Sequence, residues 1–350
     1  MAVLLATGDV LRALRVMDND SMDAGLADAP YGRRILNHRW DYAVPSVVVW
    51  REMYRVVKPG APLLVFGGRD THHRLMINIE DAGFELWDCL MWLHGNGHGT
   101  HLKPAWEPIV LAQKPRDGTY ADNIRIWGVG GLNIANCMLS GRDKAKFPVG
   151  DYANPGMYGV GGHRDGDANP DARFPANVLL THHPECEEVA NGCHPDCPIG
   201  LLNEQAGQEA SRFYYCGRAS AKERHLGLDG EKNDHPCVKP LGLCEYLARL
   251  LLPLDQGRRG TLVIPYAGTG SEMIGAMLAG WADIRGIEIN PHYADIAKKR
   301  IRYWRENNNP GLLEAKPPIA VPNLPQIAIA TSEDDNSDLA AGRTAWSLNR

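Results

Sequence analysis

The chain has 350 residues, of which 23% are charged, and a formal net charge of −5. This length fits one large α/β domain with a substantial insertion, or two domains that share a core. The weakly negative charge excludes a surface that is basic as a whole, so any contact with a nucleic acid must come from local patches. Basic residues gather at Arg33, Arg34, His38 and Arg39, at Arg142, Lys144 and Lys146, and at Arg218, Lys222 and Arg224, where ordinary solvated faces are the alternative.

No segment reaches the roughly 18 unbroken apolar residues of a membrane span, and Met1–Leu5 lacks the features of a secretory leader. We therefore expect a cytoplasmic protein with no membrane contact. In a reducing cytosol the eight cysteines are expected to be free thiols, either metal-binding or simply buried, and not a disulfide framework.

The first 94 residues alternate apolar runs with helical stretches. The expected strands are Ala2–Leu5, Met22–Ala27, Leu63–Phe66 and Phe84–Trp92, and the expected helices are Val10–Met17, Val47–Val57 and His72–Ala82. This β-α-β rhythm predicts a parallel sheet.

The rhythm is lost over residues 95–230, where Gly, Pro, Asn and Asp become frequent, and this range is expected to be an irregular insertion. It returns over residues 231–306 with helix Leu241–Leu252, strand Thr261–Ile264, helix Ser271–Ala279, strand Ile284–Ile287 and helix Tyr293–Arg305. Residues 307–350 show little periodicity and are predicted to be a disordered tail.

A tetrapeptide follows the second expected strand directly: Asp28, Ala29, Pro30 and Tyr31. Open α/β sheets place their ligands at the carboxyl ends of strands, so the position predicts a site. The Asp28 carboxylate and the Ala29 carbonyl are suited to accept the two hydrogens of an amino group, which localises the lone pair on its nitrogen. Pro30 stiffens the turn, and Tyr31 offers a face for stacking on a base. A plain β-turn is the alternative.

A glycine turn lies between a strand and a helix near the other end of the chain, and it comprises Pro265, Tyr266, Ala267, Gly268, Thr269 and Gly270. Glycines let the backbone approach a ligand closely. Glu288 ends the next strand about 20 residues later, where an acid can bond ribose hydroxyls. The combination predicts a nucleotide or adenosyl cofactor.

The segment His235-Pro236-Cys237-Val238-Lys239-Pro240 precedes the helix that leads to the glycine turn. In this order, the three elements resemble the β-class amino-methyltransferases of DNA, and in particular phage and prophage DNA methylases, over roughly residues 4–305. Protein glutamine methyltransferases, which share a similar tetrapeptide, place the glycine turn first and do not fit. Cytosine C5 methylation uses a cysteine after a proline, but Cys237 lies in the cofactor-side segment, so we reject that interpretation.

The resemblance implies a circularly permuted, Rossmann-like, class I S-adenosylmethionine-dependent methyltransferase fold of the α/β class. It implies a catalytic half at residues 1–94, a target-recognition insertion at 95–230 and a cofactor-binding half at 231–306. The catalytic residues would be Asp28, Ala29, Pro30 and Tyr31. The cofactor would be held by Asp9, Asp28, His235, Lys239, Pro240, the glycine turn from Pro265 to Gly270, and Glu288.

Two positions depart from the family pattern. Ala29 replaces a proline whose backbone carbonyl is the part used, so the chemistry is expected to survive. Ile264 replaces an aspartate beside the methionine part of the cofactor, which predicts weaker cofactor binding.

We therefore expect a site-specific methyltransferase that acts on a base flipped out of double-stranded DNA, in a bacterial or phage-encoded modification system. Adenine N6 is favoured over cytosine N4, because an aspartate opens the tetrapeptide where the cytosine enzymes more often have serine. A catalytically impaired DNA-binding relative and an enzyme acting on RNA are the alternatives. A homodimer is a possible assembly.

Histidines and cysteines cluster between residues 182 and 197. His183-x-x-Cys186 and Cys193-x-x-x-Cys197 have spacings that can close a tetrahedral zinc site. A loop-rich segment gains folding energy from metal ligation, so a structural zinc is expected. Incidental surface histidines and cysteines are the alternative.

Overall fold

The computed structural model describes residues 1–94, 102, 105–140, 172–188, 193–206, 210–217, 220, 222–253 and 260–307. All of them belong to one unit that spans residues 1–319. The predicted disordered tail beyond residue 307 and the basic residues Arg142, Lys144, Lys146 and Arg218 lie outside the described residues.

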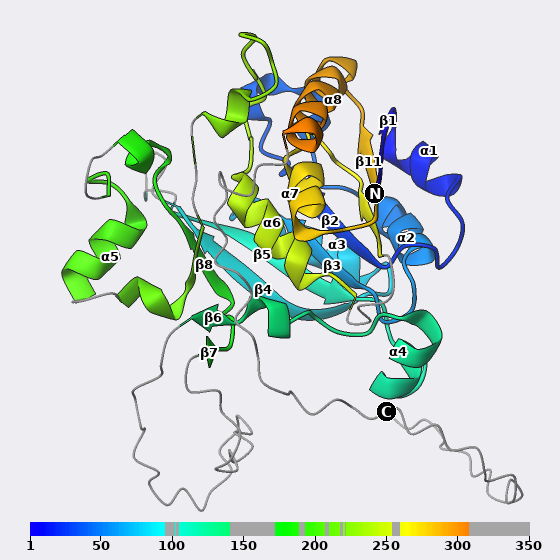
Figure 1. Cartoon of the computed structure of the whole chain (residues 1–350). Coiled ribbons are helices and arrows are strands. Elements are labelled where there is room, and N and C mark those ends of the chain that lie inside the picture. The colour runs from blue at the N-terminus through cyan, green and yellow to red at the C-terminus, as the bar shows by residue number, and fades with distance from the viewer. Residues whose placement is uncertain are drawn as a thin grey trace, which may run out of the picture. The chain divides into compact units, whose positions relative to one another are not determined.

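One nine-stranded sheet forms the centre of the described part of the chain (Figure 1). Its strands, in spatial order, are β1 (Ala2–Thr7), β11 (Asp283–Glu288), β10 (Thr261–Ile264), β2 (Ala24–Asp28), β3 (Pro62–Phe66), β5 (Trp106–Gln113), β4 (Glu85–Leu93), β8 (Val178–Thr181) and β9 (Tyr215–Gly217). Strand β5 is antiparallel to both neighbours, and every other pair is parallel. A separate pair, β6 (Leu139–Ser140) and β7 (Ala172–Arg173), is antiparallel.

The last two strands of the chain sit between its first two. Strands β10 and β11 are inserted between β1 and β2, and β10 pairs with β2 through Leu262–Ala24 and Val263–Gly25. The predicted permuted α/β fold is therefore confirmed. Because β10 and β2 are parallel neighbours, the glycine turn and the tetrapeptide emerge at the same edge of the sheet.

Helices cover both faces of the sheet (Figure 1), so the central strands β2 and β3 are buried on both sides. Leu26, Leu64 and Phe66 pack in one core with helices α6 (Leu241–Leu250), α7 (Ser271–Ala279) and α8 (Pro291–Glu306). Leu63 and Val65 pack in a second core with helices α1 (Val10–Arg15), α2 (Val47–Val56) and α3 (His72–Glu80). Nearly uninterrupted apolar strands of this kind are what a parallel sheet covered on both faces requires.

Two further helices, α4 (Tyr120–Trp127) and α5 (Pro198–Ala206), lie within the predicted insertion. Short 3-10 helices cover Ile35–Asn37, Arg39–Asp41, Ala135–Cys137, Pro184–Glu188, Ala210–Phe213 and Glu223–His225. No helix in the described ranges is both long enough and apolar enough to cross a membrane.

The range 95–230 is less separate than the loss of rhythm suggests, because β5 lies inside it. This strand pairs with β3 and β4 near the middle of the sheet, and Ile109, Val110 and Ala112 are fully buried. A β-α-β rhythm in the sequence does not reveal an antiparallel strand, because such a strand needs no helix before it. Strands β8 and β9 then extend the same sheet beyond β4.

Candidate active site

A cavity of about 270 Å³ opens at the carboxyl ends of β2, β10 and β11. It brings together residues predicted from three distant parts of the sequence. Asp9, Asp28, Ala29, Pro30, Tyr31, His235, Lys239, Pro265, Tyr266, Ala267, Gly268, Thr269 and Glu288 line it, whereas Pro240 and Gly270 do not. One cavity thus holds the tetrapeptide and most of the predicted cofactor residues.

The side chain of Asp28 belongs to a buried polar network. The Lys239 ammonium donates to Asp28 Oδ2 at 2.9 Å and to the Tyr31 hydroxyl at 3.0 Å. That hydroxyl donates to Glu107 Oε2 at 2.7 Å, and Lys239 Nζ lies 3.6 Å from the same oxygen. The sequence placed Lys239 among the cofactor residues, but its polar contacts are with the tetrapeptide and Glu107.

The network sets the ionisation of its members. Burial raises the pKa of Asp28, and the Lys239 ammonium opposes that shift. Burial alone would lower the pKa of Lys239, but Asp28, Tyr31 and Glu107 raise it well above its usual range. Burial also acts to raise the pKa of Glu107, yet Lys239 and Tyr31 outweigh it and lower that pKa. Lys239 is therefore a fixed positive charge beside a carboxylate that burial would otherwise neutralise.

A second carboxylate, Asp41, holds the backbone that follows the tetrapeptide. Its Oδ1 accepts the N–H groups of Tyr31 at 2.6 Å and Gly32 at 2.9 Å, and its Oδ2 accepts those of Arg33 at 3.2 Å and Ile35 at 2.9 Å. The Asp41 side chain is buried. Four donors on one carboxylate fix this turn, and no sequence motif indicated that role.

The glycine turn is fixed in the same way on the cofactor side. Glu288 Oε2 accepts the N–H of Gly268 at 2.8 Å, and Oε1 accepts that of Asn290 at 2.7 Å. Gly268 and Gly270 have φ of +49° and +85°, where a side chain would be strained. Each Glu288 oxygen retains a lone pair for a further donor in the cavity.

Two residues that the sequence did not indicate tie the glycine turn to its surroundings. Asn233 donates to Thr269 Oγ1 at 3.0 Å and accepts the N–H of His235 at 3.1 Å, so it links the turn to the His235–Pro240 segment. The guanidinium of Arg300 on α8 is buried and donates to the Thr269 carbonyl at 2.6 Å. The two contacts with Thr269 join residues more than 30 positions apart.

Ile264, where the family pattern has an aspartate, is fully buried at the end of β10. An acid nevertheless faces the cavity from the first turn of α7: Glu272 is 4% exposed and lines the cavity wall. Burial raises the pKa of Glu272 to about 8, and the nearby Asp28 charge adds to that shift. The cavity therefore contains an acid that would be stabilised by a cationic ligand.

Cys237 also lines the cavity, so the cysteine mechanism can be judged on its environment. Burial raises the pKa of Cys237 to about 11, although Lys239 opposes the shift. A nucleophilic cysteine needs a lowered pKa. The described site therefore favours chemistry on Asp28 over thiolate chemistry.

The predicted metal residues divide into two groups. Cys186, Cys193 and Cys197 gather around His182, whereas His183 stacks on His194 with ring centroids 4.0 Å apart. Consecutive residues after strand β8 point to different sides, and sequence spacing could not tell which histidine joins the cysteines.

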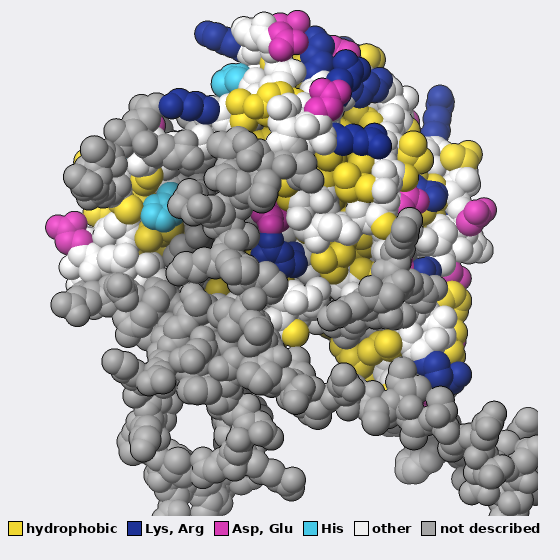
Figure 2. Space-filling model, in the orientation of Figure 1, with side chains coloured by type: hydrophobic (Ala, Val, Ile, Leu, Met, Phe, Trp, Pro, Cys, Tyr) yellow, Lys and Arg dark blue, Asp and Glu magenta, His cyan; other side chains and the backbone are white. Residues whose placement is uncertain are grey.

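The charged surface is mixed in sign. Figure 2 shows Lys and Arg interspersed with Asp and Glu at the top of the view, over α8. Lys299 of α8 pairs with Glu231 and Asp295 at 2.9 and 3.2 Å. The exposed Arg33, Arg34 and Arg39 flank Ile35 and Trp40, which line the cavity, so that basic patch adjoins it.

A comparison with protein families decides the classification. The DNA methylase family N6_N4_Mtase matches residues 26–299. The chain belongs to this family of DNA methylases. The match spans the tetrapeptide, the His235–Pro240 segment and the glycine turn.

Individual relatives are more distant. The Type II methyltransferase M.HindIII of Haemophilus influenzae is 31% identical over 110 residues, which are 23% of this chain and 36% of that protein. The chain thus matches about a third of the length of this curated relative. Among solved structures, the DNA modification methylase TTHA0409 of Thermus thermophilus is 19% identical with a TM-score of 0.43, over 86% of this chain and 95% of that one. PvuII DNA methyltransferase (cytosine-N4-specific) is 13% identical with a TM-score of 0.48, over 85% of each chain.

Proposed function

We propose that this DNA methylase transfers a methyl group from S-adenosylmethionine to the exocyclic amino group of a base in double-stranded DNA, with adenine N6 as the favoured target. The observation that carries the proposal is the single cavity in which Asp28, bound by Lys239, faces the glycine turn and Glu288.

The residues of the cavity fit S-adenosylmethionine, which supplies an activated methyl group on a sulfonium sulfur. Gly268 leaves room for close approach of a ligand, and Glu288 retains acceptor capacity for ribose hydroxyls. Pro265, Tyr266 and Thr269 complete the wall on this side. These contacts would orient the adenosyl group toward Asp28.

Glu272 is proposed to take the place of the acid that is missing at Ile264. Its carboxyl is buried at the cavity wall. Burial and the Asp28 charge raise its pKa to about 8, and Lys239 and Arg300 offset only part of that shift. The ammonium of the methionine part would supply that cation. Ile264 and Glu272 lie on consecutive elements, β10 and α7. In this proposal the acidic group of the cofactor site is therefore kept, but at a position eight residues further along the chain.

Asp28 and the Ala29 carbonyl would accept the two hydrogens of the target amino group, so that its lone pair is directed at the methyl donor. Lys239 holds the Asp28 carboxylate in place through Oδ2. Lys239 thereby acts as a positioning residue that keeps Asp28 ionised. Rate enhancement would come mainly from this positioning.

Tyr31 lines the cavity, and its hydroxyl is bound to Lys239 and Glu107. Its orientation is therefore fixed before a base arrives. A base that leaves the duplex loses stacking worth a few kcal/mol, and stacking on Tyr31 would offset part of that cost, about 1 to 3 kcal/mol.

The decisive experiment incubates the full chain with duplex DNA and S-adenosylmethionine labelled in the methyl group, followed by nucleoside analysis. We expect label in N6-methyladenine, and about 100-fold less or lower with the Asp28→Ala variant. Label in N4-methylcytosine would keep the reaction class and overturn the base assignment. A preference for structured RNA in competition would overturn the substrate.

A catalytically impaired DNA-binding relative is the second candidate, favoured by the uncharged Ile264 and the mixed surface charge. Calorimetry with S-adenosylmethionine separates the two. No binding at high micromolar concentration would favour the impaired relative. The cytoplasmic location, the homodimer and the target-recognition role of residues 95–230 stay predictions.

A further inference from the structure

We propose that His182, Cys186, Cys193 and Cys197 bind one structural zinc ion that holds α5 against the end of the sheet. None of these four residues lines the described catalytic cavity, so the proposal is independent of the methyltransferase chemistry.

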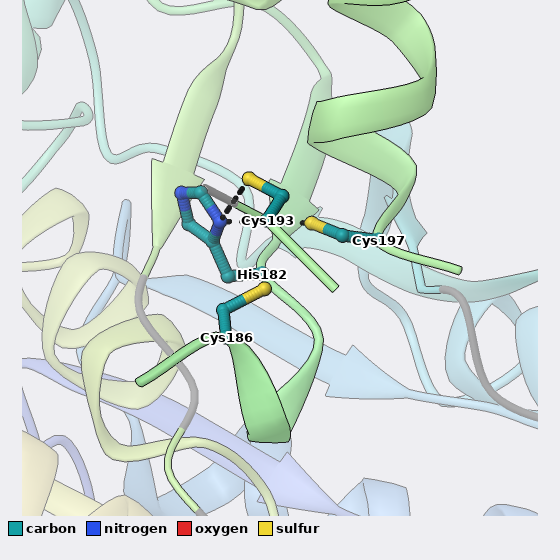
Figure 3. Close-up of side chains that lie close together, drawn as sticks. All are labelled: His182, Cys186, Cys193 and Cys197. Atoms are coloured by element: carbon teal, nitrogen blue, oxygen red, sulfur yellow. Dashed lines mark hydrogen bonds between the residues drawn. The ribbon is translucent and has the colours of Figure 1, made fainter. Parts of the chain in front are cut away.

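The four side chains come from three successive pieces of chain and converge on one point (Figure 3). His182 follows the last residue of β8, Cys186 lies in the 3-10 helix Pro184–Glu188, and Cys193 and Cys197 precede α5. Their ligand atoms all lie within 4.8 Å of one another. This convergence links the end of β8 to the start of α5.

The distances fit tetrahedral zinc. With zinc–sulfur bonds of about 2.3 Å and zinc–nitrogen bonds of about 2.0 Å, a tetrahedron places nitrogen and sulfur about 3.5 Å apart. His182 Nδ1 lies 3.5 Å from Cys193 Sγ and 3.6 Å from Cys197 Sγ (Figure 3). The ligand set Cys₃His is one that structural zinc sites use.

The surroundings support metal-bound thiolates. The N–H of His194 points at Cys186 Sγ with a distance of 3.4 Å, which stabilises charge on that sulfur. Gly200 in the first turn of α5 approaches so closely that an added Cβ would lie 2.8 Å from Cys193 Cβ. Gly200 thus lets the helix pack directly against a ligand.

This part of the molecule has little apolar core of its own. The local cluster has only three buried members among the described residues, Leu180, Cys197 and Ile199, and one of them is itself a proposed ligand. Metal ligation can replace hydrophobic burial as the source of folding free energy in such a segment. The zinc would therefore be structural.

A neighbouring group is the competing site. Glu185 Oε2 lies 3.3 Å from His194 Nε2, and His183 stacks on the His194 ring. Its Glu185 side chain is more than half exposed, and the group offers no thiolate. Zinc prefers the softer and less exposed Cys₃His set.

The test measures zinc in the purified full chain by elemental mass spectrometry. We expect about one zinc per chain, retained in His183→Ala and Cys89→Ser and lost in His182→Ala and Cys193→Ser. Cys89 is a matched control because it is a half-buried free cysteine outside the cluster.

If the ligand variants do not fold, X-ray absorption of the zinc-loaded wild-type chain gives the ligands directly. A first shell of three sulfurs and one nitrogen supports the proposal. A shell without sulfur, a disulfide among the three cysteines, or a chain that stays metal-free after addition of zinc would overturn it.

Discussion

The proposed catalytic cavity and the α5 segment, which comprises the described residues between 178 and 206, hold their side chains in different ways. The cavity lies at the ends of strands whose residues are buried in the two large cores on the faces of the sheet. The α5 segment has a core of only three buried residues among those described. In place of a larger core, it has side chains whose potential metal-ligand atoms converge on one point. Where apolar packing already fixes the backbone, a network of charged side chains can be held in a precise arrangement. A weakly packed segment instead needs its polar side chains to stabilise its fold.

Removal of the acceptor carboxylate should have the largest effect in the cavity. We expect Asp28→Ala to lower the rate of methyl transfer about 100-fold or more, which is the size of effect seen when an enzyme loses a group that accepts a proton in the reaction. Binding of S-adenosylmethionine should persist, because Glu288 and the glycine turn remain. Single-turnover methylation and calorimetry on the same preparation measure the two. Loss of binding with unchanged single-turnover rates would contradict the assignment.

Lys239 should come next, because it acts through Asp28. In Lys239→Gln the pKa of Asp28, which burial already raises, loses the opposing ammonium and rises further. Asp28 is then ionised only at higher pH, so the acid limb of the activity profile should move up and the rate at neutral pH should fall about 10-fold or more. The profile of kcat against pH provides the measurement.

The matched variant for that comparison is Lys239→Arg, which keeps the charge. It should restore the acid limb toward its original position even if the rate remains low. If the pH profile of Lys239→Gln were not shifted, Lys239 would have only a packing role. Thermal unfolding of each variant distinguishes loss of activity from loss of the fold.

Substitution of Glu272 should have a smaller effect, and it should change the affinity for S-adenosylmethionine without changing the rate of the chemical step. A charged hydrogen bond is worth about 1.5 to 3 kcal/mol, so Glu272→Gln should weaken S-adenosylmethionine about 10-fold or more. The raised pKa of about 8 should fall when a cation binds, so wild-type affinity should increase with pH up to about 8 and then level off. Calorimetry across pH is the measurement.

The variant Glu245→Gln is the control for that experiment, because Glu245 is a buried acid that pairs with Arg249 and does not line the cavity. It should leave affinity unchanged. Any titration of the ligand itself affects all three proteins alike, so only the difference reports on Glu272. Equal pH dependence in wild type and Glu272→Gln would refute its role.

The sequence predicted the site residues whose positions follow from the ends of strands. It missed the residues whose roles depend on contacts between distant parts of the chain. Asp28 and Gly268 could be placed because each lies at or just beyond the end of a strand, and parallel strands end at one edge of the sheet. Asp41 and Glu272 stand in no motif, and their roles depend on atoms that only folding brings near. Lys239 was recognised, but its contact with Asp28 spans 211 positions and was invisible to spacing.

Metal removal should have the smallest effect on the cavity, and that small effect is the sharpest test of the comparison. Chelation of zinc from the full chain should increase amide hydrogen exchange in residues 178–206, where the core is small. Exchange in β2 and β10, and affinity for S-adenosylmethionine, should change less than about twofold, since coupling between packed sites needs a shared two-state element. If chelation abolished cofactor binding, the two regions would be one cooperative unit, and the large cores alone would not explain how the cavity is held.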